Sequence, residues 1–161
     1  MPKTDPLRKQ LAAFIDFGEA HASSDAAMAD LDHALQGKRP AGLPHSPWEL
    51  LEHLRITQHD IYEFCVNPKY KEMKWPDDYW PKSPAPPSAD SWKDSVAAFR
   101  AERDAFRALA EDPKIDLFAK IPHGDGQTYL REMLLVQDHL SYHLGQLVFV
   151  RRLLGAWPPK K

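Results

Sequence analysis

The chain has 161 residues, of which 43% are hydrophobic and 27% are charged, and this suits one globular domain with a core of its own. The formal net charge of −2 excludes the strongly basic surface that attracts nucleic acid or an acidic membrane. The one cysteine, Cys65, excludes an internal disulfide and fits a reducing compartment, so we expect a cytoplasmic protein. We therefore expect a single domain over residues 1–161, with neither nucleic acid nor a membrane as a partner.

The first helical segment covers residues 6–36. Gly18 and the serines that follow it predict a bend, after which Ser24 can cap a second helical piece. Gly37 and Pro40 end the segment. We expect one broken helix, whose first piece places these apolar residues at helical spacing: Leu7, Leu11, Phe14, Ile15 and Phe17.

The second helix has the strongest start signal in the chain. Ser46 can accept a hydrogen bond from the backbone N–H of Glu49, and Glu49 can accept one from the N–H of Ser46. Pro47 occupies the first helical position, where its missing donor costs nothing. We expect the helix over residues 46–66, where Asn67-Pro68 stops it. Its core-facing stripe consists of Leu50, Leu54, Thr57, Ile61, Phe64 and Cys65.

Residues 67–89 hold six prolines among several aromatic side chains and show no regular period. A connection of this length in a small domain is usually a crossover or a lid, and its aromatic content indicates that it packs on the domain. Two further helices are expected at residues 90–111 and 127–155. Because a long middle crossover lets the second and third helices run parallel, the sequence predicts an all-α four-helix bundle in up-down-down-up order.

The last helix carries two histidines, His139 and His143, which lie one turn apart on the same face. Apolar residues occupy most of its circumference, as in a helix at the centre of a core, and its polar residues exclude a membrane span. Two imidazoles at this spacing form half of a divalent-metal site. Histidines that merely form hydrogen bonds in the core are the alternative that this pattern leaves open.

An open metal site needs about three protein ligands, with positions left for water or substrate. His53 is the candidate for the third, because it lies inside the second helix on the flank of the apolar stripe. His59 points away from His53 by about 120°, and Cys65 lies roughly 18 Å from His53 along the helix axis. The expected geometry therefore selects His53, His139 and His143.

Other polar residues are weaker candidates. Gln146, one turn beyond the histidine pair, could contact a ligand histidine, although a solvated or core-bonded side chain is the commoner role. Glu132 lies on the face of His139 but about 10 Å along the helix, so we expect it at the rim of the site. His21, at the break in the first segment, and His123, in a glycine turn, could reach a pocket mouth.

Three stretches together resemble the DinB-like superfamily, which includes the YfiT-like metal-dependent proteins. They are SPWELLEHL, the Trp-Pro and proline-rich middle, and DHLSYHLGQL followed by RRLLG, and the resemblance extends from about Leu7 to Gly155. It implies an up-down-down-up four-helix bundle, with one metal-binding histidine from the second helix and an HxxxH pair from the fourth. The matching positions are His53, His139 and His143. The resemblance implies nickel, zinc or another divalent ion, and a low-molecular-weight thiol as a further cofactor.

Two functional classes follow. In the first, the chain is an enzyme, a thiol-dependent transferase or a hydrolase acting on a small molecule, whose ion lowers the pKa of a bound water or thiol. In the second, it binds a metal or a small molecule, or acts as an interaction module, without turnover. A homodimer is also expected, because the crossover and the C-terminus hold more apolar surface than a small monomer needs to expose. The residues concerned are Trp75, Tyr79, Trp80, Leu153, Leu154 and Trp157.

Overall fold

The computed structural model describes residues 5–159 except residues 17 and 19, so Phe17 of the predicted first stripe lies outside it. The described chain is all-helical, as the sequence predicts, and contains no strand apart from an isolated bridge between Lys120 and Thr128. Its helices are α1 (Pro6–Ile15), α2 (Ser24–Ala27), α3 (His33–Gln36), α4 (Pro47–Val66), α5 (Ser91–Glu111) and α6 (Tyr129–Leu153).

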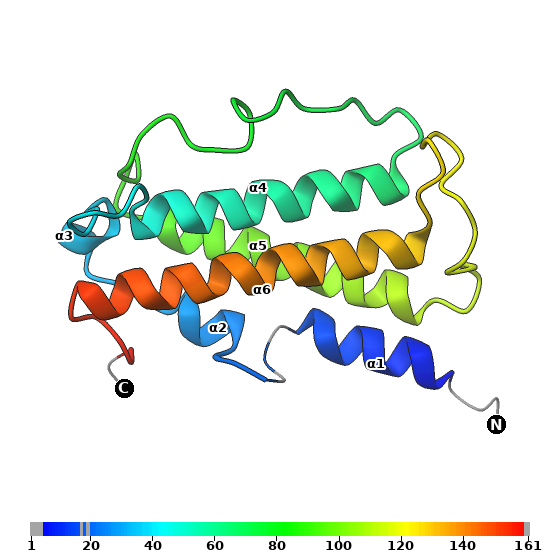
Figure 1. Cartoon of the computed structure of the whole chain (residues 1–161), viewed down its shortest axis with the longest axis horizontal. Coiled ribbons are helices and arrows are strands. Elements are labelled where there is room, and N and C mark those ends of the chain that lie inside the picture. The colour runs from blue at the N-terminus through cyan, green and yellow to red at the C-terminus, as the bar shows by residue number, and fades with distance from the viewer. Residues whose placement is uncertain (1–4, 17, 19, 160–161) are drawn as a thin grey trace.

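Three long helices, α4, α5 and α6, lie side by side along the long axis of the molecule, and α1 lies below them in Figure 1. α4 contacts both α5 and α6, and α1 contacts the same two helices, while α2 packs on α6 and α3 on α4. The connection over residues 67–90 passes along the outside of α4 and returns to the end of the molecule where α4 begins (Figure 1). α4 is therefore surrounded by α5, α6 and this 67–90 connection.

Local hydrogen bonds define where α4 and α6 begin. The predicted capping box is present, since Ser46 Oγ accepts from the Glu49 N–H at 3.2 Å and the Glu49 carboxylate accepts from the Ser46 N–H at 2.8 Å. α4 ends at Val66, as predicted. At α6 the Thr128 hydroxyl accepts from the Arg131 N–H at 3.2 Å. Both helices that carry the candidate site are thus fixed at their N-termini by their own sequence.

The single broken helix predicted over residues 6–36 is wrong in detail, because the segment forms three separate helices. Ser23, not Ser24, caps α2, and Asp32 caps α3. From the end of α2 onward the chain is held by Arg151 of α6, whose buried guanidinium needs acceptors and takes three backbone carbonyls of this segment besides that of Ala156. The carbonyls belong to Ala27, Ala29 and Asp30, at 2.9, 2.7 and 3.1 Å from the Arg151 nitrogens.

The aromatic side chains of the 67–90 connection divide into two groups. Trp75 is 67% exposed. Tyr70, Tyr79 and Trp80 are half-buried, and Trp80 packs against the hydrophobic core. The prediction that these aromatics pack on the domain is therefore confirmed for three of them and wrong for Trp75.

The centre of the core lies where α4 faces α6. Leu51 and Leu54 of α4 and Met133, Val136 and Leu140 of α6 have no exposed surface. Burial of such side chains contributes about 1.5–3 kcal/mol each relative to exposure, so this interface is the main source of stability near the histidines. Within the described residues, no helix combines the length and apolarity that crossing a membrane requires.

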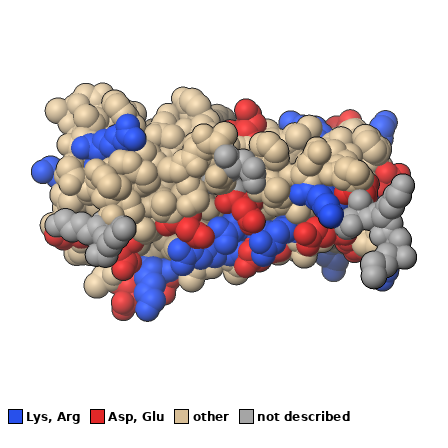
Figure 2. Space-filling view, turned by 90° about the horizontal axis from the view of Figure 1, so that it is seen from below, with Lys and Arg blue, Asp and Glu red and all other residues tan. Residues whose placement is uncertain are grey.

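Ion pairs join α5 to the N-terminal segment. Arg100 and Arg103 contact Asp25, and Arg107 contacts Asp16. Figure 2 shows basic and acidic side chains interleaved in a band along one side of this face, with few charged groups on the rest of it. Each of these surface ion pairs contributes little to the stability of the fold, about 0–1 kcal/mol.

Candidate metal centre

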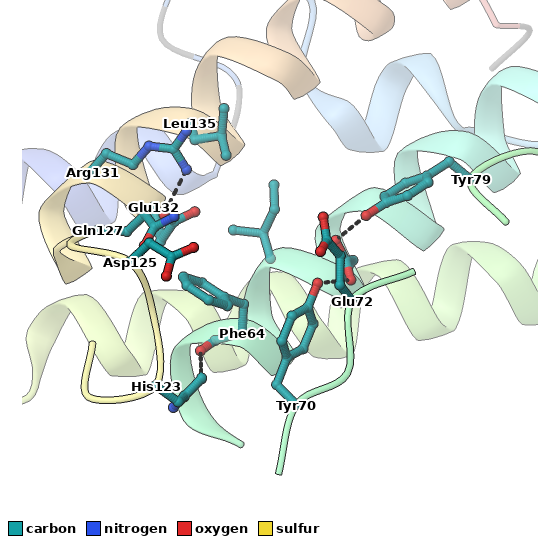
Figure 3. Close-up of a pocket in the computed structure, with 12 residues that line it drawn as sticks. Phe64, Tyr70, Glu72, Tyr79, His123, Asp125, Gln127, Arg131, Glu132 and Leu135 are labelled. Atoms are coloured by element: carbon teal, nitrogen blue, oxygen red, sulfur yellow. Dashed lines mark hydrogen bonds and ion pairs between the residues drawn. The ribbon is translucent and has the colours of Figure 1, made fainter. Parts of the chain in front are cut away.

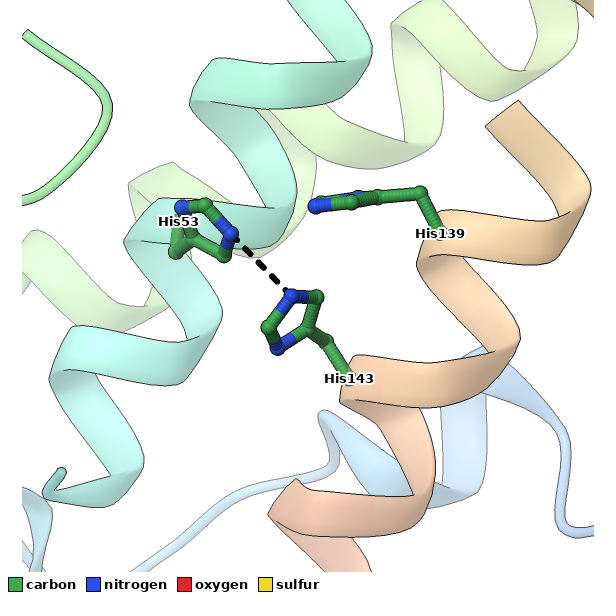
Figure 4. Close-up of side chains that lie close together, drawn as sticks. All are labelled: His53, His139 and His143. Carbon is green, nitrogen blue, oxygen red and sulfur yellow. Dashed lines mark hydrogen bonds between the residues drawn. The ribbon is translucent and has the colours of Figure 1, made fainter. Parts of the chain in front are cut away.

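Three histidines from two helices converge where α4 faces α6. His53 lies in the second turn of α4, and His139 and His143 lie near the middle of α6. One ring nitrogen from each lies within 4.8 Å of the other two, and no other cluster of potential metal ligands is found in the described part of the chain. Figure 4 shows the three rings directed into the space between the two helices. The structure thus brings together the three histidines that the sequence selects.

The outer nitrogens of His53 and His143 both face oxygen acceptors. His53 Nδ1 lies 2.7 Å from the backbone carbonyl of Tyr79, which can only accept, so this nitrogen carries the proton. His143 Nδ1 lies 2.7 Å from Oε1 of Gln146 and donates to it. Each neutral ring therefore has its lone pair on Nε2.

His139 follows the same pattern through Thr57. The Thr57 hydroxyl donates its only proton to the His53 carbonyl at 2.7 Å. It can then only accept from Nδ1 of His139, which lies 3.3 Å away. All three imidazoles are protonated on the outer nitrogen and keep Nε2 free, as metal-binding histidines do when their second nitrogen is hydrogen-bonded.

Among the inner nitrogens, Nε2 of His53 and Nε2 of His143 lie 3.2 Å apart. With both protons on Nδ1, two lone pairs face each other, which is unfavourable unless a cation or an additional proton lies between them. Two nitrogens bound to one tetrahedral zinc ion at about 2.0–2.1 Å are themselves about 3.3 Å apart. The spacing and the donor type therefore fit a shared divalent ion.

Burial keeps these imidazoles neutral. It lowers the pKa of His53 to about 3 and that of His139 to about 4 from the ordinary value of 6.5, and it lowers the pKa of His143 as well. Neighbouring histidines add to the shift in the pKa of His53, while its bond to the Tyr79 carbonyl opposes it. Neutral imidazole is the form that binds metals, so all three side chains are ready to bind near neutral pH.

The 67–90 connection covers His53. The ring of Trp80 stacks on that of His53, with centroids 3.8 Å apart and planes 2° from parallel. His45, just before α4, stacks on Trp80 at 4.1 Å and 11°. Trp80 therefore lies between two imidazoles and closes one side of the histidine cluster.

A cavity of about 420 Å³ lies between α4 and α6, one to two helical turns from the histidines. Figure 3 shows residues of α6 on one side of it and tyrosines of the 67–90 connection on the other. The phenol groups of Tyr70 and Tyr79 donate to the two carboxylate oxygens of Asp60 at 2.8 and 2.7 Å. Burial, followed by the bond to Asp60, raises the pKa of both phenols, so they stay protonated as donors. Four carboxylates and one guanidinium line the cavity: Asp60, Glu72, Asp125, Glu132 and Arg131.

Two of the weaker candidates lie close to the histidines or the cavity. Gln146 contacts His143, as described above. Glu132 is only 2% exposed and accepts from Arg131 Nη1 at 2.7 Å. Its carboxylate lines the cavity wall beside the histidine cluster and is not one of the clustered metal-binding groups.

The other two candidate histidines, His21 and His123, lie apart from the cluster. His123 lines the cavity and donates from Nε2 to the Phe64 carbonyl at 2.8 Å. His21 lines a different depression, beside Ser141 of α6, whose hydroxyl lies 3.3 Å from His21 Nε2. Both thus reach a pocket, but only His123 reaches the one beside the histidine cluster.

The sequence identifies the three histidines but only some of the residues that orient them. The sequence places Thr57 in the core stripe, although its position one turn after His53 on the same face is a signal that it could bond to a nearby imidazole. Tyr79 acts on His53 through a backbone carbonyl, for which no residue type is diagnostic. For Trp80 the sequence predicts packing on the domain, and its ring packs on His53 itself.

Comparison with known proteins identifies the family of this chain. A family model described as the DinB superfamily matches residues 16–147, which include all three histidines of the cluster. Neither a curated protein nor a solved structure gives a significant match to the chain. Since the matched region covers most of the 161 residues, the chain belongs to the DinB superfamily.

Proposed function

We propose that His53, His139 and His143 bind one divalent metal ion through Nε2 and that the chain is a metal-dependent enzyme. It would act on a small molecule as a thiol-dependent transferase or as a hydrolase. The observation that carries this proposal is the 3.2 Å distance between Nε2 of His53 and Nε2 of His143. Both imidazoles are buried and neutral, so the lone pairs of these two atoms face each other. Nickel and zinc suit such a donor set. When bound, the ion would lower the pKa of a coordinated water or thiol and so supply a nucleophile near neutral pH.

The cavity beside the histidines supports the proposal that the substrate is a small molecule. Its volume of about 420 Å³ is in the range of small-molecule sites. Its four carboxylates against one arginine favour a neutral or cationic molecule over an anionic one. A small thiol would be the second reactant in the transferase case.

We also propose the up-down-down-up order for the bundle of α1, α4, α5 and α6. In support, the 67–90 connection runs back along the outside of α4, so that α4 and α5 begin at the same end of the molecule in Figure 1. A cytoplasmic location completes the proposal, because the single cysteine is free and buried, as suits a reducing compartment.

Metal analysis tests the central claim. Protein purified without an immobilised nickel column should carry or take up about one equivalent of zinc or nickel. Replacing His53, His139 or His143 by Ala should abolish tight binding while circular dichroism shows that the helices persist. His59→Ala is the matched control, since this exposed histidine lies on α4 and pairs with Glu102 instead. Wild-type protein without measurable affinity, or full metal retention in all three variants, would end the proposal.

An activity screen separates the enzyme from a binding module. The metal-loaded protein is assayed for transfer of a small thiol to electrophiles and for hydrolysis of neutral and cationic esters and amides. The enzyme proposal expects turnover that disappears after chelation and in His139→Ala. Tight binding of one ion by a protein that turns over none of these compounds would favour the non-catalytic alternative.

A further inference from the structure

His53 is held by the 67–90 connection as well as by its own helix. Its Nδ1 donates to the Tyr79 carbonyl at 2.7 Å, and its ring stacks on Trp80 at 3.8 Å. The first contact fixes which nitrogen carries the proton, and the second fixes the plane of the ring. The direction in which Nε2 of His53 points therefore depends on where Tyr79 and Trp80 lie.

Tyr79 is fixed in turn by Asp60, which lies two turns after His53 on α4, about 10 Å along the axis. The Tyr79 hydroxyl donates to Asp60 Oδ2 at 2.7 Å. Tyr79 thus contacts α4 at two points, with its hydroxyl at Asp60 and its carbonyl at His53. Because the hydroxyl contact limits where the residue can lie, it also limits where its carbonyl can lie.

We propose that Asp60 is a positioning residue for the metal centre. Acting through Tyr79, it holds the carbonyl that keeps the His53 proton on Nδ1 and turns Nε2 toward His143. This inference rests on the proposed metal binding and adds that tight binding depends on a carboxylate two turns after His53 on the same helix. The competing explanation is that Asp60 only fastens the 67–90 connection to α4.

Three conservative variants separate the two explanations. Tyr79→Phe removes only the hydroxyl, and Asp60→Asn keeps the shape of the side chain but removes its charge. Tyr70→Phe is the matched control, because it removes the other hydroxyl bound to the same carboxylate, at 2.8 Å, and keeps the hydroxyl that Tyr79 donates to Asp60. The zinc dissociation constant of each full-length variant is measured by competition with a chelator, and urea unfolding of the metal-free proteins reports global stability.

The positioning role predicts zinc affinity about 10-fold weaker for Tyr79→Phe and for Asp60→Asn, and within about 3-fold of wild type for Tyr70→Phe. The double variant Asp60→Asn/Tyr79→Phe should bind no more weakly than the weaker single variant, since both act along one path. The absorption spectrum of bound cobalt should change in the same two variants only. Wild-type affinity in Tyr79→Phe, or an equal loss in Tyr70→Phe, would overturn the proposal.

A second measurement does not need the metal. Proton–nitrogen NMR spectra of the imidazoles in chelator-treated protein report which ring nitrogen carries the proton. His53 should be the Nδ1–H tautomer alone in wild type and in Tyr70→Phe, and a mixture of tautomers in Tyr79→Phe and Asp60→Asn. An unchanged His53 signal in these two variants would overturn the positioning role. Failure of the wild type to bind zinc would instead refute the proposed function.

Discussion

Buried histidines make the metal-free protein sensitive to acid. Burial lowers the pKa of His53 to about 3 and that of His139 to about 4, whereas the ordinary value that applies in the unfolded chain is 6.5. Below pH 6.5 the unfolded chain therefore binds more protons at these positions than the folded chain, so the free energy of unfolding falls as the pH falls. The loss begins near pH 6.5 and continues until these groups are protonated in the folded protein, near pH 3.

Because of the lowered pKa of His53 alone, we expect the free energy of unfolding to fall by on the order of 2 kcal/mol from pH 7 to pH 5. Urea unfolding of chelator-treated protein at the two pH values measures this difference. His53→Gln cannot take up a proton and should lose less stability over the same interval. His33→Gln removes an exposed histidine and should keep the wild-type dependence. The same pH dependence in His53→Gln as in wild type would show that His53 is not the titrating group.

The N-terminus of α4 is held by a buried serine with two hydrogen-bond partners. Ser46 is fully buried; its hydroxyl accepts from the Glu49 N–H and also donates to the Pro84 carbonyl of the 67–90 connection. Ser46→Ala should lower the free energy of unfolding by about 1–2 kcal/mol. Thr128→Ala at the start of α6 should cost only about 1 kcal/mol, because among the described residues the Thr128 hydroxyl has no second partner besides the Arg131 N–H. Urea unfolding with unchanged m-values compares the two, and a larger loss in Thr128→Ala would contradict this account.

Helices were predictable where their signals are local. Ser46, Pro47 and Glu49 are adjacent in the sequence, so the start of α4 could be inferred without knowing what packs on it. The 6–36 segment was not predictable in this way. Its interruption after α2 depends on Arg151, more than 100 residues later, whose guanidinium takes the local carbonyls. A contact of this sequence separation leaves no periodic signal in the segment that it changes.

In the candidate site, too, the features with local sequence signals were predictable and those that depend on tertiary contacts were not. The pair His139 and His143 follows from helical spacing, and His53 from its place beside the apolar stripe of α4, so the three could be grouped from the sequence. The link from Asp60 to His53 could not, because it passes through the backbone of Tyr79 in a segment without regular structure. Metal ligands can be inferred from the type and spacing of side chains, whereas the groups that orient these ligands are set by tertiary packing.

At the scale of the molecule, α6 carries an apolar stripe that nothing in the described chain covers. Its members are between 52% and 65% exposed and lie within about 100° of one another around the helix. The residues that the sequence suggested for a dimer are mostly used within the domain, since only Trp75 and Leu153 among them are largely exposed. The stripe on α6 consists of Leu134, Tyr142, Phe149 and Leu153.

We propose that the chain forms a homodimer through this stripe, because burying these four side chains against a second copy removes apolar surface from water at no cost to the core. Light scattering at micromolar concentration should then return about twice the chain mass of 18.4 kDa. Phe149→Glu and Leu153→Glu place a charge in the interface and should give the mass of one chain. Phe118→Glu is the matched control, because Phe118 is 67% exposed but lies in the connection before α6, and it should leave the dimer intact. A wild-type mass of one chain would refute the dimer, and a dimer that persists in both glutamate variants of α6 would place its interface elsewhere.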